Sequence, residues 1–244
     1  MKPVCDTKKV NKRNTLMVAH RGISGIETEN TASAFVAAGN RSYYGIETDV
    51  YRTADGKFML FHDRELKRVG GEDILVEKCS LDVYQSVILI DKFEQNKSRA
   101  DVRIATLENY IGICKKYGKV AVLELKSSFT QEEINRIIEI IKSYDFLDGV
   151  TFIAFEWENL EKVRAVSPEQ PVQFLTCEYS EELVARLKAA KFDLDILQNQ
   201  LTRENIKVLH DNGIKVNCWT VDDVERANEL AEWGVDYITS NICE

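Results

Sequence analysis

Short apolar runs rich in β-branched residues alternate, from residue 15 onward, with segments whose apolar residues recur at helical spacing. Nine of these runs have the length and composition of strands. They cover residues 15–20, 45–50, 57–63, 119–126, 150–155, 172–176, 194–200, 215–221 and 235–240. Strands that alternate with helices of about 10–15 residues predict βαβ units and a parallel sheet.

Polar residues at the edges of the amphipathic segments mark where helices begin. Thr130 and Glu133 have the spacing of a capping box, in which each side chain accepts a hydrogen bond from the backbone N–H of the other residue. The apolar residues that follow fall on one helical face: Ile134, Ile137, Ile138 and Ile141. Further helices are expected behind N-caps at Thr106, Ser180 and Thr202.

The number of repeating units predicts the architecture. About eight βα units in about 230 residues fit a closed (β/α)8 TIM barrel, an α/β fold. An open doubly wound sheet is the structural alternative, but no G-x-G-x-x-G follows the first strand. The chain has only 3 prolines and 12 glycines and no linker rich in them. We therefore expect one domain over residues 15–244, after a flexible tail of residues 1–14.

Two connections depart from the repeating unit. Residues 51–58, between the second and third strands, are too few for a helix and contain the turn dipeptide Asp-Gly. Residues 64–104 form a long insertion with at most one helix, near residues 80–90. The barrel is thus expected to be irregular around strands 2 and 3, and an insertion at its mouth often shapes substrate access.

The charge balance restricts the partners. A formal net charge of −8 argues against non-specific nucleic-acid binding, which needs a basic face, and no RNA-binding or zinc-finger signature is present. An anionic substrate would need a bound cation or a few well-placed basic groups to offset the acidic field. The six cysteines have no C-x-x-C spacing and are expected to be reduced thiols.

No segment predicts a membrane span or an intact signal peptide. Apolar runs stay well short of the roughly 20 residues that a spanning helix needs, and the basic residues of positions 1–14 are not followed by an apolar stretch. We expect a cytoplasmic protein without stable membrane insertion, although a secreted or periplasmic chain that had lost its signal peptide would look the same. The oligomeric state is left open.

Ionisable residues stand where four of the predicted strands end. In a TIM barrel the carboxyl ends of the strands meet at one mouth, and the loops there build the active site. Four pairs of residues occupy such positions: His20 and Arg21, Glu47 and Asp49, His62 and Asp63, and Glu124 and Lys126. We therefore expect them to converge.

The acidic residues of this group suggest a hard cation. Glu47 and Asp49 are two apart on one strand, so both face the same side. For an isolated pair of this kind, the solvent face of an amphipathic strand is the ordinary explanation. Facing a barrel interior, however, unpaired carboxylates would cost several kcal/mol each. Together with Glu124, and without a cysteine or imidazole cluster, they favour one divalent cation, Mg²⁺ or Ca²⁺.

The two histidines of this group have the chemistry of an acid and a base. An imidazole has an ordinary pKa near 6.5, which suits proton transfer in either direction at neutral pH. Arg21, next to His20, carries a planar guanidinium that matches phosphate oxygens. The third histidine, His210, stands at a predicted helix end and is assigned no function.

Taken in order, these motifs resemble those of the glycerophosphodiester phosphodiesterase family, which are phospholipase-C-like TIM-barrel enzymes. The resemblance covers most of residues 15–240. It runs through AHRG, ENTASAF, GIETDV, TADGKFMLFHD, IATLENYI, LELK, CWTV and GVDYITS. The combination is specific, whereas ENT or LELK alone would be weak.

The resemblance implies a role for each residue at the mouth. His20 and His62 would be the acid–base pair, Glu47, Asp49 and Glu124 would hold the metal, and Arg21 and Lys126 would contact the phosphate. The reaction implied is hydrolysis of a small glycerophosphodiester to sn-glycerol 3-phosphate and an alcohol. Either water or the glycerol 2-hydroxyl could attack first.

Aromatic residues complete the implied substrate site. Trp219, in CWTV, looks like the tryptophan that this family places at the barrel mouth, although core packing would also explain it. Phe155 and Trp157 could line the pocket as well. The chain departs from the family at Ala154-Phe155-Glu156, where Ser-Phe-Asp is usual, and at Asn241, where aspartate is common. Neither change falls on a predicted metal or histidine position, so the catalytic assignment stands. The two changes bear instead on which alcohol is accepted, and on whether it is a glycerol headgroup.

Three other functions are alternatives to this one. A phospholipase-D-like or phosphoinositide-cleaving relative acting on lipid would benefit from an exposed aromatic or basic loop. A non-catalytic phosphodiester-binding protein on the same barrel would be favoured by loss of a histidine or metal carboxylate, and none is lost. A sugar-phosphate isomerase would leave the carboxylate trio unexplained.

Overall fold

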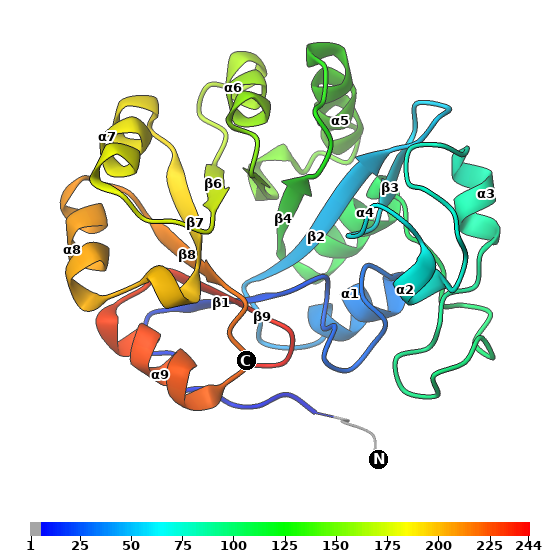
Figure 1. Ribbon diagram of the computed structural model, residues 1–244, viewed down its shortest axis with the longest axis horizontal. Helices are drawn as coiled ribbons and strands as arrows, with labels where there is room; N and C mark the ends of the chain where they lie inside the picture. Colours follow the sequence, from blue (N-terminus) through cyan, green and yellow to red (C-terminus); the bar gives the residue numbers. More distant parts are fainter. Residues whose placement is uncertain (1–5) are drawn as a thin grey trace.

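The strands close into a barrel in the computed structural model, which describes residues 6–244. Within that range the strands, listed in chain order, are β1 (Leu16–Ala19), β2 (Gly45–Arg52), β3 (Phe58–Leu60), β4 (Val120–Leu125), β5 (Val150–Ala154), β6 (Val172–Thr176), β7 (Asp193–Leu197), β8 (Val216–Trp219) and β9 (Tyr237–Ser240). Their order in the sheet is β1-β9-β8-β7-β6-β5-β4-β2, and β1 pairs with β2 to close it. Eight parallel strands thus form the predicted TIM barrel (Figure 1).

Helices cover the outside of the barrel, as the alternation of segments predicted. In chain order they are α1 (Ala32–Gly39), α2 (Lys67–Gly70), α3 (Leu81–Ser86), α4 (Leu107–Tyr117), α5 (Gln131–Ser143), α6 (Trp157–Val166), α7 (Glu181–Ala190), α8 (Arg203–Asp211) and α9 (Val224–Trp233). Two 3-10 turns, Leu147–Gly149 and Gln198–Gln200, complete them. The strand predicted over residues 194–200 is therefore shorter than expected, because residues 198–200 form the second of these turns and β7 ends at Leu197.

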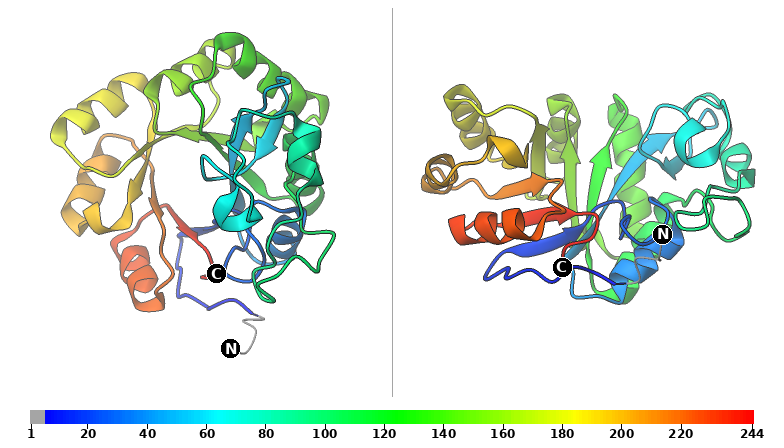
Figure 2. Two further views of the ribbon diagram at one scale, coloured as in Figure 1. Left: turned by 45° about the vertical axis from the view of Figure 1, so that its right-hand side comes forward. Right: turned by 60° about the horizontal axis from the view of Figure 1, so that its bottom comes forward.

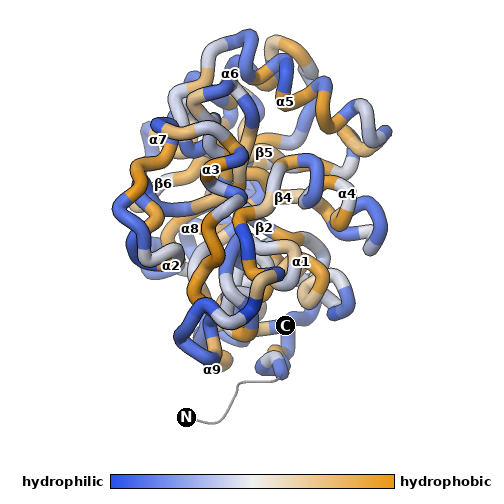
Figure 3. The backbone as a smooth tube through the Cα atoms, turned by 90° about the vertical axis from the view of Figure 1, so that its right-hand side faces the viewer, coloured by the Kyte–Doolittle hydropathy of each residue, from blue (hydrophilic) through white to orange (hydrophobic). Residues whose placement is uncertain are grey.

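Side-chain caps fix the helix starts at the predicted positions. Thr106, Thr130 and Thr202 each form a capping box, and Ser180 accepts a bond from the backbone of Leu183. The four predicted isoleucines of α5 are all buried. Burying one such side chain stabilises a fold by about 1.5–3 kcal/mol, which explains how the helices are held on the barrel. Figure 3 shows hydrophobic and hydrophilic residues alternating along them.

The barrel interior is partly apolar and partly ionisable. Residues that pair across neighbouring parallel strands face the same side, and Val18, Val122, Ile153 and Leu175 meet inside the barrel. The same register places Asp49 of β2 beside Glu124 of β4. The apolar layer lies beneath, so the charged groups are carried near the carboxyl ends of the strands.

The expected irregularity lies between β2 and α4. β3 pairs with β2 in antiparallel register through the short Asp-Gly turn and so stands outside the parallel barrel. The insertion of residues 64–104 contains two helices, α2 and α3, so the expectation of at most one helix was wrong. α2 is a single turn, and Gly71, which follows it, has a φ of +66°. Figure 2 shows this insertion, coloured cyan to green, gathered at one side of the barrel.

The first described residues pair with the last residues of the chain, near the C mark in Figure 1. Lys8 and Val10 donate backbone hydrogen bonds to residues 242 and 244, each at 3.0 Å. This part of the tail that was expected to be flexible is therefore fastened to the barrel, because it pairs with the last residues of the chain. Residues 1–5, which include Cys5, lie outside the described range. The other cysteines are free thiols, as predicted, and among residues 6–244 no helix is long and apolar enough to cross a membrane.

Candidate active site

A sharp turn after β1 presents His20 and Arg21 to the barrel mouth. Arg21 and Gly22 have φ values of +52° and +75°, and a Cβ at Gly22 would lie only 2.7 Å from the Cβ of Ala34. Only glycine fits this position without strain. The turn is also attached to β2, because the backbone N–H of Arg21 donates a hydrogen bond to Glu47 Oε2 at 2.8 Å.

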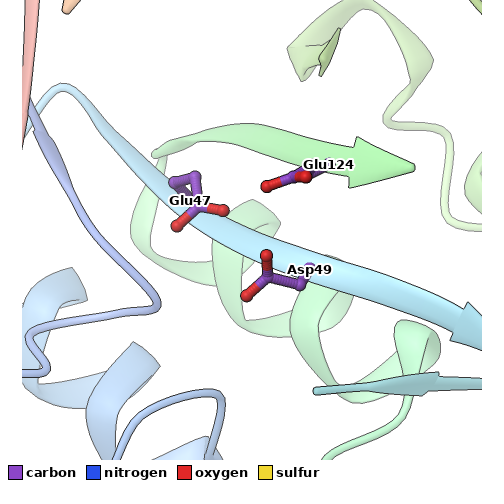
Figure 4. Close-up of side chains that lie close together, drawn as sticks. All are labelled: Glu47, Asp49 and Glu124. Atoms are coloured by element: carbon purple, nitrogen blue, oxygen red, sulfur yellow. The ribbon is translucent and has the colours of Figure 1, made fainter. Parts of the chain in front are cut away.

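Three buried carboxylates face one another across β2 and β4. Glu47, Asp49 and Glu124 each offer an oxygen, and these oxygens lie within 4.8 Å of one another (Figure 4). Asp49 Oδ1 is buried and has no hydrogen-bond partner among residues 6–244. A cluster of oxygen donors with an uncommitted atom suits a hard divalent cation, so the donor set fits the predicted metal.

The protonation of these carboxylates supports the same conclusion. Burial, together with the charge of Asp49, raises the pKa of Glu47, and the same two causes raise that of Glu124 to about 8. Burial would also raise the pKa of Asp49, but the cations Arg21 and Lys126 outweigh it and lower that pKa. A bound cation would hold all three ionised, because it compensates the repulsion that otherwise favours protonation.

Asn30 and Lys126 hold Asp49 in place. The amide of Asn30 donates to Asp49 Oδ2 at 2.9 Å, and Thr48 donates to the amide oxygen of Asn30 at 2.7 Å. Lys126 Nζ lies 3.0 Å from Glu124 Oε1 and 3.6 Å from Asp49 Oδ1. These contacts leave Asp49 Oδ1 directed at its neighbours in the cluster.

His20 is oriented by Asn241, at a position where the chain departs from the family pattern. Its Nδ1 lies 2.7 Å from Asn241 Oδ1, and the amide of Asn241 donates to Asp222 Oδ2 at 2.6 Å. Because that amide nitrogen is committed to Asp222, its oxygen must accept from the Nδ1–H of His20. The departure at Asn241 leaves His20 itself unchanged but supplies its hydrogen-bond partner. Burial, with Arg21 second, lowers the pKa of His20 to about 4.

A chain of ion pairs connects His62 to Arg21. His62 Nδ1 lies 2.7 Å from Asp63 Oδ1, whose other oxygen accepts from Arg68 Nε at 2.7 Å. Arg68, supplied by α2 of the insertion, also donates two hydrogen bonds to Glu29, at 2.8 and 2.7 Å. Glu29 in turn accepts from Arg21 at 2.9 Å. The insertion therefore helps to orient both sides of the site.

The predicted residues surround one pocket of about 160 Å³ at the carboxyl ends of the strands. Of those residues His20, Arg21, Glu47, His62, Glu124, Lys126, Phe155 and Trp219 line it. Asp49 lies beneath the lining, 1% exposed. Phe155 and Trp219 meet edge to face, with ring centroids 5.9 Å apart. Trp157 does not line the pocket, contrary to expectation, because it packs against Phe174 and Phe192 in the outer shell.

A wider groove of about 820 Å³ opens beside this pocket and shares His62, Glu124, Lys126 and Phe155 with it. Glu156, the other departure from the family pattern, lines the groove and accepts a hydrogen bond from Ser128. The insertion contributes Glu77, whose carboxylate accepts from Ser127 at 2.6 Å. The groove has room for a polar group attached to whatever occupies the inner pocket.

The sequence analysis missed several residues of the site: Glu29, Asn30, Arg68, Asp195, Asp222 and Thr239. Asn30 belongs to the ENTASAF motif and Thr239 to GVDYITS, so the sequence pointed to both segments. No motif in the sequence pointed to Arg68 or Asp222, because Arg68 reaches the site from α2 and Asp222 from the loop between β8 and α9. The remaining histidine, His210, lies on α8 and pairs with Asp236, in agreement with its lack of an assigned role.

With the geometry established, the chain can be compared with known proteins. Residues 20–243 match the glycerophosphoryl diester phosphodiesterase family. The chain belongs to this family. It is similar to a glycerophosphodiester phosphodiesterase of Caldanaerobacter subterraneus, with 28% identity over 232 residues that cover 93% of this chain and 94% of that protein. Membership makes the chain a phosphodiesterase and confirms the resemblance of its motifs.

Solved structures of the family share the barrel. A phosphodiesterase of Oleispira antarctica in complex with the product sn-glycerol-3-phosphate has a TM-score of 0.86 and 26% identity, with 96% of both chains covered. A glycerophosphodiester phosphodiesterase from Parabacteroides distasonis has a TM-score of 0.78 and 26% identity, with 93% of both chains covered. The predicted TIM barrel is thereby confirmed twice, by the strand order and by these relatives.

Proposed function

We propose that this protein hydrolyses small glycerophosphodiesters to sn-glycerol 3-phosphate and an alcohol, with one divalent cation at Glu47, Asp49 and Glu124. The main support for this proposal is that the carboxylate cluster, in which Asp49 Oδ1 has no hydrogen-bond partner among residues 6–244, lies at the same pocket as His20 and His62. The product complex of the Oleispira antarctica relative supports the glycerol 3-phosphate half of the substrate.

Arg21 and Lys126 bind the phosphate in this proposal. Both are about 85% buried and both line the pocket. Each is held by the carboxylates, so its cationic head is positioned before the substrate arrives, and preorganised cations stabilise the charge that develops on phosphoryl oxygens. The cation supplies Lewis-acid polarisation of the same oxygens when it is bound, and Mg²⁺ and Ca²⁺ both suit the oxygen ligands.

The partners of the two histidines suggest how they divide the proton transfer. His20 donates from Nδ1 to a neutral amide, so its Nε2 is left unprotonated and can take the proton from the attacking hydroxyl of water or glycerol. Burial lowers the pKa of His62 as well, and Arg21 and Lys126 add to that shift while Asp49 and Asp63 oppose it. The assignment rests on the partners: His62 faces the Asp63 carboxylate, which stabilises an imidazolium, whereas His20 faces a neutral amide. In this proposal His62 therefore protonates the departing alkoxide. The wider groove on the His62 side has room for the leaving alcohol.

The proposal is tested by following glycerol 3-phosphate release from glycerophosphocholine, glycerophosphoethanolamine and glycerophosphoglycerol. Release should stop with EDTA and return with Mg²⁺ or Ca²⁺, whose rates identify the preferred cation. His20→Ala and His62→Ala should fold yet lose most activity, and Glu47→Ala should also lose metal affinity. His210→Ala, a histidine outside the pocket, is the matched control and should be fully active.

Two results would contradict the assignment. A His20 or His62 variant with full turnover would remove that histidine from the reaction. Metal binding without release from any of the three diesters would redirect attention to intact lipid substrates, or to a binding function without catalysis.

A further inference from the structure

Asp195 is a buried carboxyl that the proposed mechanism does not use. It lies on β7, is 2% exposed, and lines the inner pocket on a different strand from the metal carboxylates. Its Oδ1 has no hydrogen-bond partner within residues 6–244. A buried polar atom without a hydrogen-bond partner lowers the stability of the fold by about 1–3 kcal/mol. Such atoms are rare in folded proteins, and one that lines a pocket points to a bound ligand.

The neighbouring side chains do not supply the missing partner. In register, Asp195 stands between Leu175 of β6 and Asn217 of β8. Asn217 lies near enough to Asp195 to oppose the rise of its pKa as a hydrogen-bond donor, but the hydrogen bonds of its amide go to Thr239, at 3.1 and 3.2 Å, and to Gln173 at 3.4 Å. Leu175 is apolar. A hydrogen-bond partner for Oδ1 of Asp195 must therefore come from a molecule bound in the pocket.

A second unpartnered polar atom lines the same pocket. Trp219 Nε1, on the adjacent strand β8, is buried and also lacks a hydrogen-bond partner among the described residues. Ile153 and Leu175 line the wall beside them. An apolar wall with two isolated polar groups fits a short carbon chain that carries hydroxyls, because the methylene groups contact the wall and the hydroxyls reach the polar atoms.

The state of the carboxyl suits a hydroxyl better than a cation. Burial, with the charge of Glu124 second, raises the pKa of Asp195 and so favours its neutral form. A neutral carboxyl can donate one hydrogen bond and accept others, as a hydroxyl group can. The ionised form would accept from a hydroxyl equally well, so the contact does not depend on the protonation state.

We propose that Asp195 binds a hydroxyl of the substrate's glycerol chain and makes the enzyme selective for phosphodiesters whose inner alcohol carries free hydroxyls. This inference rests on the proposed function, since it assigns the glycerol end of the same pocket. Trp219 Nε1 lies on the adjacent strand as a second donor for that chain. Asp195 is thus a specificity-determining residue rather than a further metal ligand.

The test compares substrates that differ by one hydroxyl. The kcat/KM of the wild type, Asp195→Ala and Asp195→Asn is measured on glycerophosphocholine and on its two deoxy analogues, built on propane-1,2-diol and propane-1,3-diol. Asp195→Ala should lose about 10- to 100-fold on glycerophosphocholine, the value of one buried hydrogen bond. On the analogue that lacks the bound hydroxyl it should differ from wild type by less than about threefold.

The conservative variant and the control separate recognition from structure. Asp195→Asn keeps a donor and an acceptor and should stay within a few-fold of wild type on all three diesters. Asp193→Asn changes the same strand without lining the pocket and should affect every substrate equally, if at all. Should Asp195→Ala fail to fold, Asp195→Val replaces it, because valine removes both oxygens yet leaves no cavity.

An equal loss of kcat/KM on all three diesters would overturn the proposal, because a purely structural residue cannot sense one substrate hydroxyl. If the wild type hydrolyses no diester, the proposed reaction fails separately. The hydroxyl contact is then judged by calorimetric binding of glycerol 3-phosphate against its 1-deoxy and 2-deoxy analogues, where Asp195→Ala should remove the preference for glycerol 3-phosphate. An unchanged preference would refute it.

Discussion

Asn30 is predicted to control metal affinity without touching the metal. Its side chain donates to Asp49 Oδ2 and accepts from Thr48, so it fixes which Asp49 oxygen faces the cluster. Its backbone has φ +55°, which asparagine tolerates and alanine does not. Asn30→Gly is therefore the cleanest deletion, because glycine removes the amide without adding backbone strain.

The size of the effect follows from the bond that is lost. A hydrogen bond to a charged acceptor contributes about 1.5–3 kcal/mol, and glycine adds conformational entropy to the unfolded chain worth up to about 1 kcal/mol. Without metal, the unfolding free energy should therefore fall by about 1.5–4 kcal/mol. Loss of a group that orients a ligand typically lowers metal affinity about 10- to 100-fold, and kcat should recover at saturating metal because no catalytic group is removed.

Calorimetric titration of Mg²⁺ or Ca²⁺ measures the affinity, and urea denaturation in EDTA measures the stability. Asn40→Gly is the matched control, since the amide of Asn40 bonds only a backbone carbonyl on the surface at the end of α1. It should leave metal affinity unchanged. If Asn30→Gly loses stability but binds metal as tightly as the wild type, Asn30 is only an anchor of its loop and the reasoning is refuted.

Three further predictions concern other parts of the barrel. Arg68→Met should lower kcat/KM about tenfold with under about 1 kcal/mol lost in stability, because a half-exposed arginine stabilises little but orients Asp63 and Glu29; equal activity to Arg99→Met, whose ion pairs lie outside the pocket, would contradict it. Tyr110→Phe should lower the unfolding free energy by about 1–2 kcal/mol in thermal denaturation, since its buried hydroxyl donates to Ile46 O at 2.6 Å, and an unchanged Tm would count against that bond. Burial would raise the pKa of Glu244, but hydrogen bonds from Ser42, Thr7 and Lys9 lower it to about 2. The ionised carboxylate should therefore stabilise the fold above pH 4.5, and this stabilisation should be lost as the pH falls toward 2. The stability difference from Glu244→Gln should shrink over that range, and a difference independent of pH would exclude the ionised carboxyl as its cause.

The sequence by itself determined the elements and most of the chemistry. The strand runs, the Thr-x-x-Glu and Thr-x-x-Asn caps and the apolar face of α5 are local patterns, and local patterns act within a few residues of the chain. The carboxylate pair Glu47 and Asp49 was readable because period-two alternation puts both on one face of β2. Convergence of strand ends then followed from the parallel arrangement.

The tertiary structure alone decided which groups surround these residues. Asn241 bonds His20 across 221 positions of sequence, Arg68 of the insertion reaches two carboxylates, and residues 7–10 join the far end of the chain. Such contacts depend on barrel closure and on the path of the insertion, which no local spacing encodes. Likewise, the missing partner of Asp195 is visible only once every neighbouring side chain has been placed, because hydrogen-bond satisfaction is a property of the packed interior and not of the strand that carries the residue.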